Sequence, residues 1–138
     1  MSVEKGNEHF KIYDAAVDDV DFDGYLWDLS EKNDWEPLAI LMDNLSVHST
    51  PRVEIAYEEL DIIRIPNVSY SPDFNPIEAC FSQVKRHFCA ERLNILANHN
   101  EFDWHKLIKA SFKKITPELV EACWRRSFSM LKDFKDTE

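Results

Sequence analysis

The spacing of hydrophobic and polar positions changes along the chain and predicts a series of short elements. Residues 9–17 read HFKIYDAAV and predict a strand, because apolar and polar side chains alternate at its start. From Phe22 to Lys32 the apolar residues recur at helical spacing, and Asp21 precedes them as a candidate N-cap. The run from Pro37 to Met42 is apolar at every position, which is typical of a strand buried on both faces of a parallel or mixed sheet.

A second helix and a third strand are predicted after this run. The helix extends from Thr50 or Pro51 to about Glu59, because Pro is favoured at a first helical position and Ser49 or Thr50 can serve as the cap. Residues 62–66 read IIRIP and predict a short strand that is followed by turn signals. The order strand, helix, buried strand, helix, strand indicates an α/β protein.

The remainder of the chain is predicted to be helical. Asn75 caps a helix that has Pro76 at its first position. Two further helices are predicted, one near residues 104–114 and one from residue 117 to about 134. The apolar stripe of the first of these three helices consists of Ile77, Phe81, Val84 and Phe88.

Composition and charge limit the classes of protein to consider. The chain has 138 residues and is 44% hydrophobic, which is enough for one core of ordinary size. Its net charge is −10 and is unevenly spread, with 16 acids and 4 bases in residues 1–61 against 10 acids and 12 bases in residues 62–138. Because binding to phosphates needs excess Lys and Arg, any DNA contact is expected from the second half or from another chain. The acids otherwise form only a solvated face.

Two kinds of targeting segment are not expected. No apolar run reaches the length of a membrane span, and the acidic start of the chain does not resemble a secretory signal. Three cysteines without a CxxC pair fit a reducing compartment. Cys80 and His87 share one helix face, and Cys89 and Cys123 could complete a zinc site, but this spacing matches no recognised ligand set, so we interpret the cysteines as core residues.

Two acids follow structured elements and carry the candidate chemistry. Asp43 ends the buried strand, and ligands of open α/β sheets bind at the carboxyl ends of strands, although an Asp there can also simply cap a turn. Glu78 is three residues after Asn75, which is the spacing of a capping box and gives Glu78 a purely structural alternative. If both carboxylates reach the same sheet edge, they offer the oxygen ligands that Mg²⁺ prefers. Two such ions about 4 Å apart support phosphoryl transfer.

Both acids lie in segments that resemble mariner-type and related insertion-sequence transposases. LAILMDNLSVHST resembles the segment around the second catalytic aspartate of that group, and YSPDFNPIEACFSQVKRHF resembles its Ser-Pro-Asp-aromatic-Asn-Pro-Ile-Glu loop and helix. The interval between Asp43 and Glu78 holds 34 residues, which is the spacing of that group. The segment DWHKLIKASFKKITPELVEACWRRSFSML is similar to its C-terminal helices. The resemblance covers about Gly6 to Met130.

The resemblance implies a fold and a chemistry. The fold is a ribonuclease-H-like α/β domain, which residues 1–138 form as a single truncated unit, and the chemistry is DDE-type cutting and joining of DNA strands with Mg²⁺ or Mn²⁺. Asp43 matches the second metal-binding acid and Glu78 the third. The flanking motif positions are Asn44, His48, Asp73 and Asn75.

The roles of the flanking positions stay open at the level of sequence. His48 either orients a phosphate or the metal shell, or it is an ordinary satisfied histidine. Asp73 is more simply a turn former than a ligand. The family would use a basic surface for DNA backbone contacts, which makes Lys85 and Arg86 candidates, against the alternative of ordinary helix exteriors. Further basic residues of that candidate surface are Lys109, Lys113, Lys114, Arg125 and Arg126.

The sequence departs from the family at the first catalytic aspartate. In the family that residue lies on the first strand, well before the segment that HFKIYDAAVDD resembles, which is the third strand. The helix-turn-helix region that precedes it in the family is also missing. Five nearby acids do not lie in the expected element: Asp14, Asp18, Asp19, Asp21 and Asp23. With two of three metal ligands, we expect the isolated chain to bind Mg²⁺ weakly and to be inactive.

The same departure affects the sheet and the partners. The strand from Pro37 to Met42 is left with an unpaired edge, and such edges pair with other chains. We therefore expect a partner chain that supplies strands, a rearranged sheet, or a fragment of a longer polypeptide. Two hypotheses follow: part of a DDE transposase that acts on DNA, or a domesticated transposase remnant that serves as a non-catalytic subunit of a larger assembly. The family resemblance implies a nuclear location for the first.

Overall fold

The computed structural model describes residues 1–68, 71–98 and 101–135, and its chain divides into two units. Unit 2 is the continuous segment Glu8–Asn75. Unit 1 consists of Met1–Asn7 together with Pro76–Glu138, so the chain crosses from one unit to the other after residue 7 and again after residue 75.

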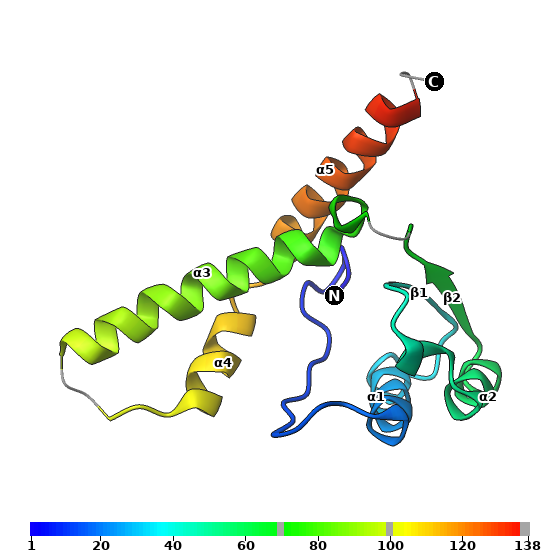
Figure 1. The fold of residues 1–138 in the computed structure, drawn as a ribbon, viewed down its shortest axis with the longest axis horizontal. Helices are drawn as coiled ribbons and strands as arrows, with labels where there is room; N and C mark the ends of the chain where they lie inside the picture. Colours follow the sequence, from blue (N-terminus) through cyan, green and yellow to red (C-terminus); the bar gives the residue numbers. More distant parts are fainter. Residues whose placement is uncertain (69–70, 99–100, 136–138) are drawn as a thin grey trace. The chain divides into compact units, whose positions relative to one another are not determined.

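Unit 2 has a parallel strand pair packed on two helices (Figure 1). Its helices are α1, Asp19–Lys32, and α2, Pro51–Glu59, and its strands are β1, Leu38–Met42, and β2, Ile62–Pro66. Two short 3₁₀ turns complete it: η1, Ser46–Ser49, and η2, Pro72–Phe74. Helix α2 connects the two strands, which is the crossover that a parallel pair needs. The predicted bounds of α2 and β2 are confirmed.

The two strands pair in register along their whole length. Leu38 lies opposite Ile62, and Met42 lies opposite Pro66. In the part of the chain that the structure describes, the sheet contains these two strands alone, so β1 has an edge without a strand partner, as the sequence predicts.

One face of the sheet forms the core of unit 2. Buried side chains from α1, α2 and both strands pack together there: Leu26, Met42, Val53, Ala56, Tyr57, Leu60 and Ile62. The other face is not covered in the same way, since Ile63 is 65% exposed and Ile65 is 45% exposed. The prediction that the run from Pro37 to Met42 is buried on both faces is therefore wrong, because only alternate positions of β1 point toward α1 and α2.

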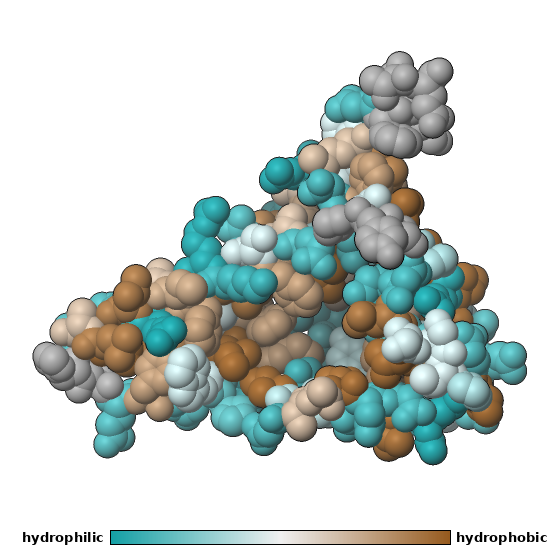
Figure 2. Space-filling model, viewed as in Figure 1, coloured by the Kyte–Doolittle hydropathy of each residue, from teal (hydrophilic) through white to brown (hydrophobic). Residues whose placement is uncertain are grey.

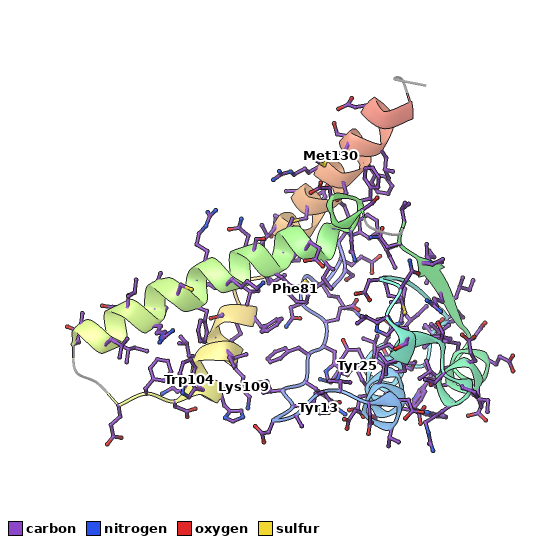
Figure 3. The ribbon with its side chains drawn as sticks, viewed as in Figure 1. Tyr13, Tyr25, Phe81, Trp104, Lys109 and Met130 are labelled. Atoms are coloured by element: carbon purple, nitrogen blue, oxygen red, sulfur yellow. The ribbon has the colours of Figure 1, made fainter. Side chains whose placement is uncertain are left out.

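The segment before α1 is not a strand, which corrects the prediction for residues 9–17. It is irregular chain that is held against α1 by aromatic side chains. The Tyr25 ring stacks on His9 at a centroid distance of 5.0 Å, and the Tyr25 hydroxyl donates to the His9 carbonyl. The Tyr13 hydroxyl donates to the carbonyl of Asp21 (Figure 3). The alternation in this segment therefore reflects docking on a helix instead of pairing in a sheet.

Helix α1 begins earlier than the sequence suggests. Its N-cap is Asp18, whose carboxylate accepts hydrogen bonds from the amides of Val20 and Asp21. Asp21 lies at the third helical position, and its carboxylate accepts from the Asp18 amide to complete a capping box. Asp21 is thus the second half of the box instead of the N-cap.

Unit 1 is helical, with α3 packed against both of its other helices (Figure 1). Its elements are α3, Pro76–Ala97, α4, Trp104–Phe112, and α5, Pro117–Lys135, close to the predicted ranges. The core contains Cys80, Val84, Ile115, Val120 and Cys123. The buried face of α3 is therefore shifted from the predicted stripe, since Phe81 and Phe88 are only half-buried.

The N-terminal residues belong to unit 1 through a close backbone approach. Ser2 and Gly6 form an isolated antiparallel bridge, and the Asn7 amide donates to the carbonyl of Ile115. Gly6 has a φ of +73°, and a Cβ atom there would lie 2.7 Å from the Ile115 carbonyl oxygen. A side chain is therefore excluded at residue 6 both by conformation and by space.

The helices of the described residues include none that is long and apolar enough to cross a membrane. The core interpretation of the cysteines is confirmed for two of the three, since Cys80 and Cys123 are buried and Cys89 is exposed.

Candidate functional site

Asp43 directly follows β1, at the carboxyl end of the parallel pair. Its side chain is 50% exposed, so the carboxylate is accessible from solvent. The backbone after the strand turns into η1, which brings His48 back toward the strand end. The predicted position of Asp43 at the end of a buried-strand run is confirmed, although the strand itself is only partly buried.

His48 holds Asp43 through two contacts of one ring nitrogen. His48 Nδ1 lies 3.1 Å from the Asp43 carbonyl oxygen and 3.2 Å from Asp43 Oδ1. Both partner atoms are acceptors, so Nδ1 is the nitrogen that carries the proton in this arrangement. The other carboxylate oxygen, Oδ2, accepts no hydrogen bond from any residue that the structure describes. The contact therefore orients the carboxylate and leaves one oxygen available to a ligand.

The η1 turn that carries His48 is itself held from α2 and β2. The Tyr57 hydroxyl donates to the His48 carbonyl at 3.0 Å, and burial raises the pKa of Tyr57, which keeps this donor protonated. Arg64 Nη1 also donates to the His48 carbonyl, at 3.4 Å, and contacts Ser49 Oγ. The Phe22 ring lies against the imidazole at 4.6 Å between centroids. His48 is thus fixed by its backbone and by its ring.

Asn44 connects the two strand ends. Its Nδ2 donates to the carbonyl of Asn67 at 2.8 Å, and the Asn67 amide donates to the carbonyl of Met42 at 2.8 Å. Asn67 follows β2 as Asn44 follows β1, so these bonds join the loops at the carboxyl edge of the sheet. The motif Asp-Asn-x-x-x-His therefore builds one local structure in which the Asn fixes the loop and the His fixes the acid.

The acids near α1 have structural roles. Asp18 and Asp21 form the capping box, and Asp23 accepts a hydrogen bond from Trp27 Nε1 at 3.1 Å and lies 3.7 Å from Arg52. These contacts account for three of the five carboxylates in the N-terminal acidic segment.

Glu78 lies in the first turn of α3 and is exposed. Its carboxylate takes part in no hydrogen bond or ion pair with any residue in the described ranges, so the predicted capping box is not formed on its Glu78 side. The Glu78 backbone carbonyl accepts from Ser82 Oγ at 3.0 Å, which is ordinary helical back-bonding. A carboxylate at a helix N-terminus is favoured by the helix dipole.

The loop residues that precede α3 differ in exposure. Asp73 lies in η2 and is exposed, which fits a turn former. Asn75 is 5% exposed, immediately before Pro76. Lys85 and Arg86 are exposed on α3, so both are accessible as the DNA hypothesis requires.

Asp43 belongs to unit 2 and Glu78 to unit 1, and the prediction that their carboxylates meet at one sheet edge stays a prediction. Among residues 1–68, 71–98 and 101–135, no three His, Cys, Asp or Glu side chains gather in a group that could hold a metal ion. The same finding covers the zinc alternative built on the cysteines.

Sequence reasoning missed the residues that support His48 and Asn44. Tyr57 of α2 and Arg64 of β2 support His48. Asn67, which follows β2, supports Asn44. One feature of the sequence could have drawn attention to Arg64, because it is among only four basic residues of the acidic unit 2. Asn67 could have been noticed as well, because it is a polar residue directly after β2, as Asp43 is directly after β1.

Comparisons with known proteins agree with the motifs and with the fold. The family model of the DDE superfamily endonuclease matches residues 1–97. A structure of the Mos1 transposase catalytic domain with raltegravir and Mn has a TM-score of 0.51 and 17% identity, over 90% of this chain and 71% of that domain. A second structure of the same domain, with raltegravir and Mg, has a TM-score of 0.49 and 17% identity over the same shares. No curated protein sequence matches this chain significantly.

The structural likeness shows that the chain has the ribonuclease-H-like fold of that domain, which agrees with the predicted α/β class. The family match extends over both motif segments, including Asp43, Asn44 and His48 as well as Glu78. The chain belongs to the DDE superfamily endonuclease family.

Proposed function

We propose that this chain is a transposase-derived DDE domain that retains two of the three metal-binding carboxylates of its family, Asp43 and Glu78, and that it does not cut DNA by itself. The observation that carries the proposal is the intact local structure around Asp43. His48 orients the carboxylate, Asn44 fixes the loop, and one carboxylate oxygen stays open to solvent. A structure of this kind suits the second acid of a DDE site.

The two family acids, Asp43 and Glu78, are ligands of the chemical type that a hard divalent cation prefers. Asp43 and Glu78 are both exposed carboxylates, and Mg²⁺ and Mn²⁺ prefer oxygen ligands. When bound, such ions stabilise the attacking and leaving oxygens of phosphodiester displacement. The contribution of this chain is to hold Asp43 in one orientation through His48 and to present Glu78 from a rigid helix. Positioned ligands on rigid elements are what a metal site requires.

The proposal of inactivity rests on the ligand count. The sequence offers no match to the first acid of the family, and a site with two carboxylates binds the second metal ion poorly. DNA-cutting activity would then need a third carboxylate from another chain or another segment of polypeptide.

A second candidate function is supported by charge. Unit 2 carries 16 acids and 4 bases, so the unit that holds Asp43 repels the phosphates of DNA. A domesticated, non-catalytic subunit of a protein assembly would have no need for DNA affinity. Under this alternative Asp43 and Glu78 are relics of ancestry.

One experiment separates these functions. Supercoiled plasmid is incubated with the chain and Mn²⁺, and Mn²⁺ affinity is measured by electron paramagnetic resonance on the same preparations. The proposal expects no nicking, together with weak Mn²⁺ binding that Asp43→Asn and Glu78→Gln each reduce further.

Matched control variants show whether Mn²⁺ binding depends specifically on Asp43 and Glu78. Glu59→Gln and Glu101→Gln replace exposed acids, one in each unit, and should leave Mn²⁺ binding unchanged. Mn²⁺ binding that no variant alters would refute the retained site and favour the structural subunit. Nicking that Asp43→Asn abolishes would refute the claim of inactivity.

A further inference from the structure

Unit 1 contains an apolar groove between α3 and α4 that the DDE chemistry does not use. Its volume is about 330 Å³, and it is lined by Phe81, Val84, Lys85, Phe88, Cys89, Ile108, Ser111 and Phe112. Figure 3 labels Phe81 on α3 and Lys109 on α4, the two helices that form the groove. In Figure 2, tan and brown side chains gather over this part of the molecule.

The lining offers few polar groups for a nucleotide or a sugar. Ser111 contributes a hydroxyl, but that hydroxyl donates to the carbonyl of Leu107 at 2.9 Å within α4. Lys85 is the one charged residue among those that line the groove. A phosphate or a base would lose its hydrogen bonds with water in such a groove and gain few in return. The groove therefore suits apolar side chains.

The shape of the groove suits a third helix. Phe81, Val84 and Phe88 are spaced by three and four residues along α3, and Ile108 and Phe112 by four along α4. Phe81 and Phe88 are about 10 Å apart along the axis of α3, which is two helical turns. A partner helix that presents apolar residues at positions i, i+3 or i+4, and i+7 matches this length.

The rim of the groove is basic. Residues 104–114 contain four lysines and no acid. Lys109 is exposed and directly follows Ile108, so it flanks the groove on α4, whereas Lys85 lines the groove on α3. A helix with carboxylates beside its apolar stripe would pair with both lysines, while a basic helix would be repelled.

From the groove and its rim, we propose that α3 and α4 form a docking site for an acidic amphipathic helix of a partner protein. The apolar stripe of that helix fills the groove, and its carboxylates face Lys85 and Lys109. This docking site is independent of whether Asp43 and Glu78 bind a metal ion.

The test uses the whole chain and a synthetic probe. Fluorescence anisotropy measures the binding of a labelled helical peptide that carries Leu and Phe at heptad spacing and Glu elsewhere. A second peptide has Lys in place of every Glu, and a third has Ser in place of every Leu and Phe. We expect only the first peptide to bind, and more tightly at low salt than at high salt.

Variants locate the binding on the groove. Phe88→Ser and Lys109→Glu should each weaken the binding of the acidic peptide about tenfold. Leu93→Ser replaces a 69% exposed apolar residue on the same helix, and Lys132→Glu an exposed lysine on α5, and both should bind as the wild type does.

Chemical labelling of Cys89 tests the groove without any substitution, so its result cannot be caused by a misfolded variant. Cys89 lines the groove and is exposed, while Cys80 and Cys123 are buried. A bulky maleimide should therefore react at Cys89 and block the peptide, and bound peptide should slow that reaction.

Three results would overturn the proposal. Equal affinity for the acidic and basic peptides would show that the rim does not select charge. Displacement of the peptide by a DNA duplex would assign the basic rim to nucleic acid. Self-association of the chain that Phe88→Ser abolishes, measured by analytical ultracentrifugation, would make a second copy the occupant.

Discussion

The two units of this chain hold the two family acids in different ways. In unit 2, Asp43 is oriented by His48, whose own backbone is held by Tyr57 and Arg64. In unit 1, Glu78 projects from the first turn of a helix, and its carboxylate has no partner among the described residues. A carboxylate held by a network keeps its geometry without a ligand, whereas one on a bare helix turn is positioned by the backbone alone.

The units also differ in charge and in core. Unit 2 is strongly acidic and builds its core from one face of a parallel strand pair, while unit 1 has 10 acids and 12 bases and a core of helices around two buried cysteines. The difference teaches that Asp43 with its motif and the groove between α3 and α4 lie on parts of the molecule with separate cores, whereas Glu78 shares unit 1 with the groove. The surroundings of Asp43 and the groove can therefore each be altered without direct damage to the core of the other.

The largest expected loss of stability comes from truncating one core side chain in either unit. Leu26 is 1% exposed in unit 2 and Leu107 is 6% exposed in unit 1, so replacing either with Ala should cost about 2–5 kcal/mol through lost burial and a cavity. We expect hydrogen exchange, followed by mass spectrometry, to speed up mainly in the unit that carries the substitution. Equal acceleration in both units would show one cooperative fold and would break the comparison.

A pair of glycine substitutions should shift stability in opposite directions. Gly6→Ala in unit 1 forces a Cβ to 2.7 Å from the Ile115 carbonyl oxygen at a positive φ, and should destabilise the protein by about 1–3 kcal/mol. Gly24→Ala in α1 meets nothing within 4 Å and should stabilise unit 2 by about 0.5–1 kcal/mol. Urea denaturation of both variants measures the two signs, and a neutral Gly6→Ala would contradict the close approach.

Substitutions at two helix caps, one in each unit, compare the units through smaller losses of stability. Asp18 accepts from two amides of α1, whereas Asp103 accepts from the single amide of Lys106 in α4. Asp18→Ala and Asp103→Ala should each cost about 1 kcal/mol, with the larger loss at Asp18 because two donors are left without their acceptor. Thermal unfolding by circular dichroism provides the values. The reverse order would show that the capping box adds nothing.

A further effect appears only at high pH and concerns the thiol pair of unit 1. Burial, with a contribution from a hydrogen bond to Cys123, raises the pKa of Cys80 from 9.0 to about 12. The folded state therefore keeps a proton that the unfolded state loses. The stability from this site is fully present below pH 9 and is lost as the pH rises toward 12. Denaturation by urea across this range measures the decline.

Matched cysteine variants test the assignment to Cys80. Cys80→Ala should make the alkaline decline smaller, with a remainder from the phenol of Tyr25, whose pKa is raised by burial from 10.0 to about 12. Cys89→Ser at the exposed cysteine should leave the decline unchanged. A decline of the same size in Cys80→Ala would place its origin in groups other than this thiol.

The helices and the two motif segments could be predicted from the sequence because their signals are local. Pro51 and Pro76 mark helix starts, and the bounds of α2 and β2 agree with the predicted ones. Asp43 and His48 were identified through the motif, but their contact was not, because it depends on how η1 turns back on β1. The predicted strand over residues 9–17 was wrong because a strand needs a partner, and aromatic docking on α1 took its place.

The burial of the sheet was also misjudged for a physical reason. An all-apolar run indicates that each face tolerates burial, but it does not say whether an element covers each face. Ile63 and Ile65 are as apolar as the core residues and remain exposed. The groove of unit 1 escaped prediction for a similar reason, since the apolar stripe that includes Phe81 and Phe88 does not say whether another element covers those side chains.

The placement of Met1–Asn7 in unit 1 has a consequence for synthesis. These residues are synthesised before unit 2, whereas their hydrogen-bonding partner at Ile115 is synthesised after the whole of unit 2. Unit 2 is a continuous segment and has its own core, so it has the contacts to fold while the rest is translated. The two segments of unit 1 then associate after the segment between them has folded, so the rate of their association depends on the closure of that long loop.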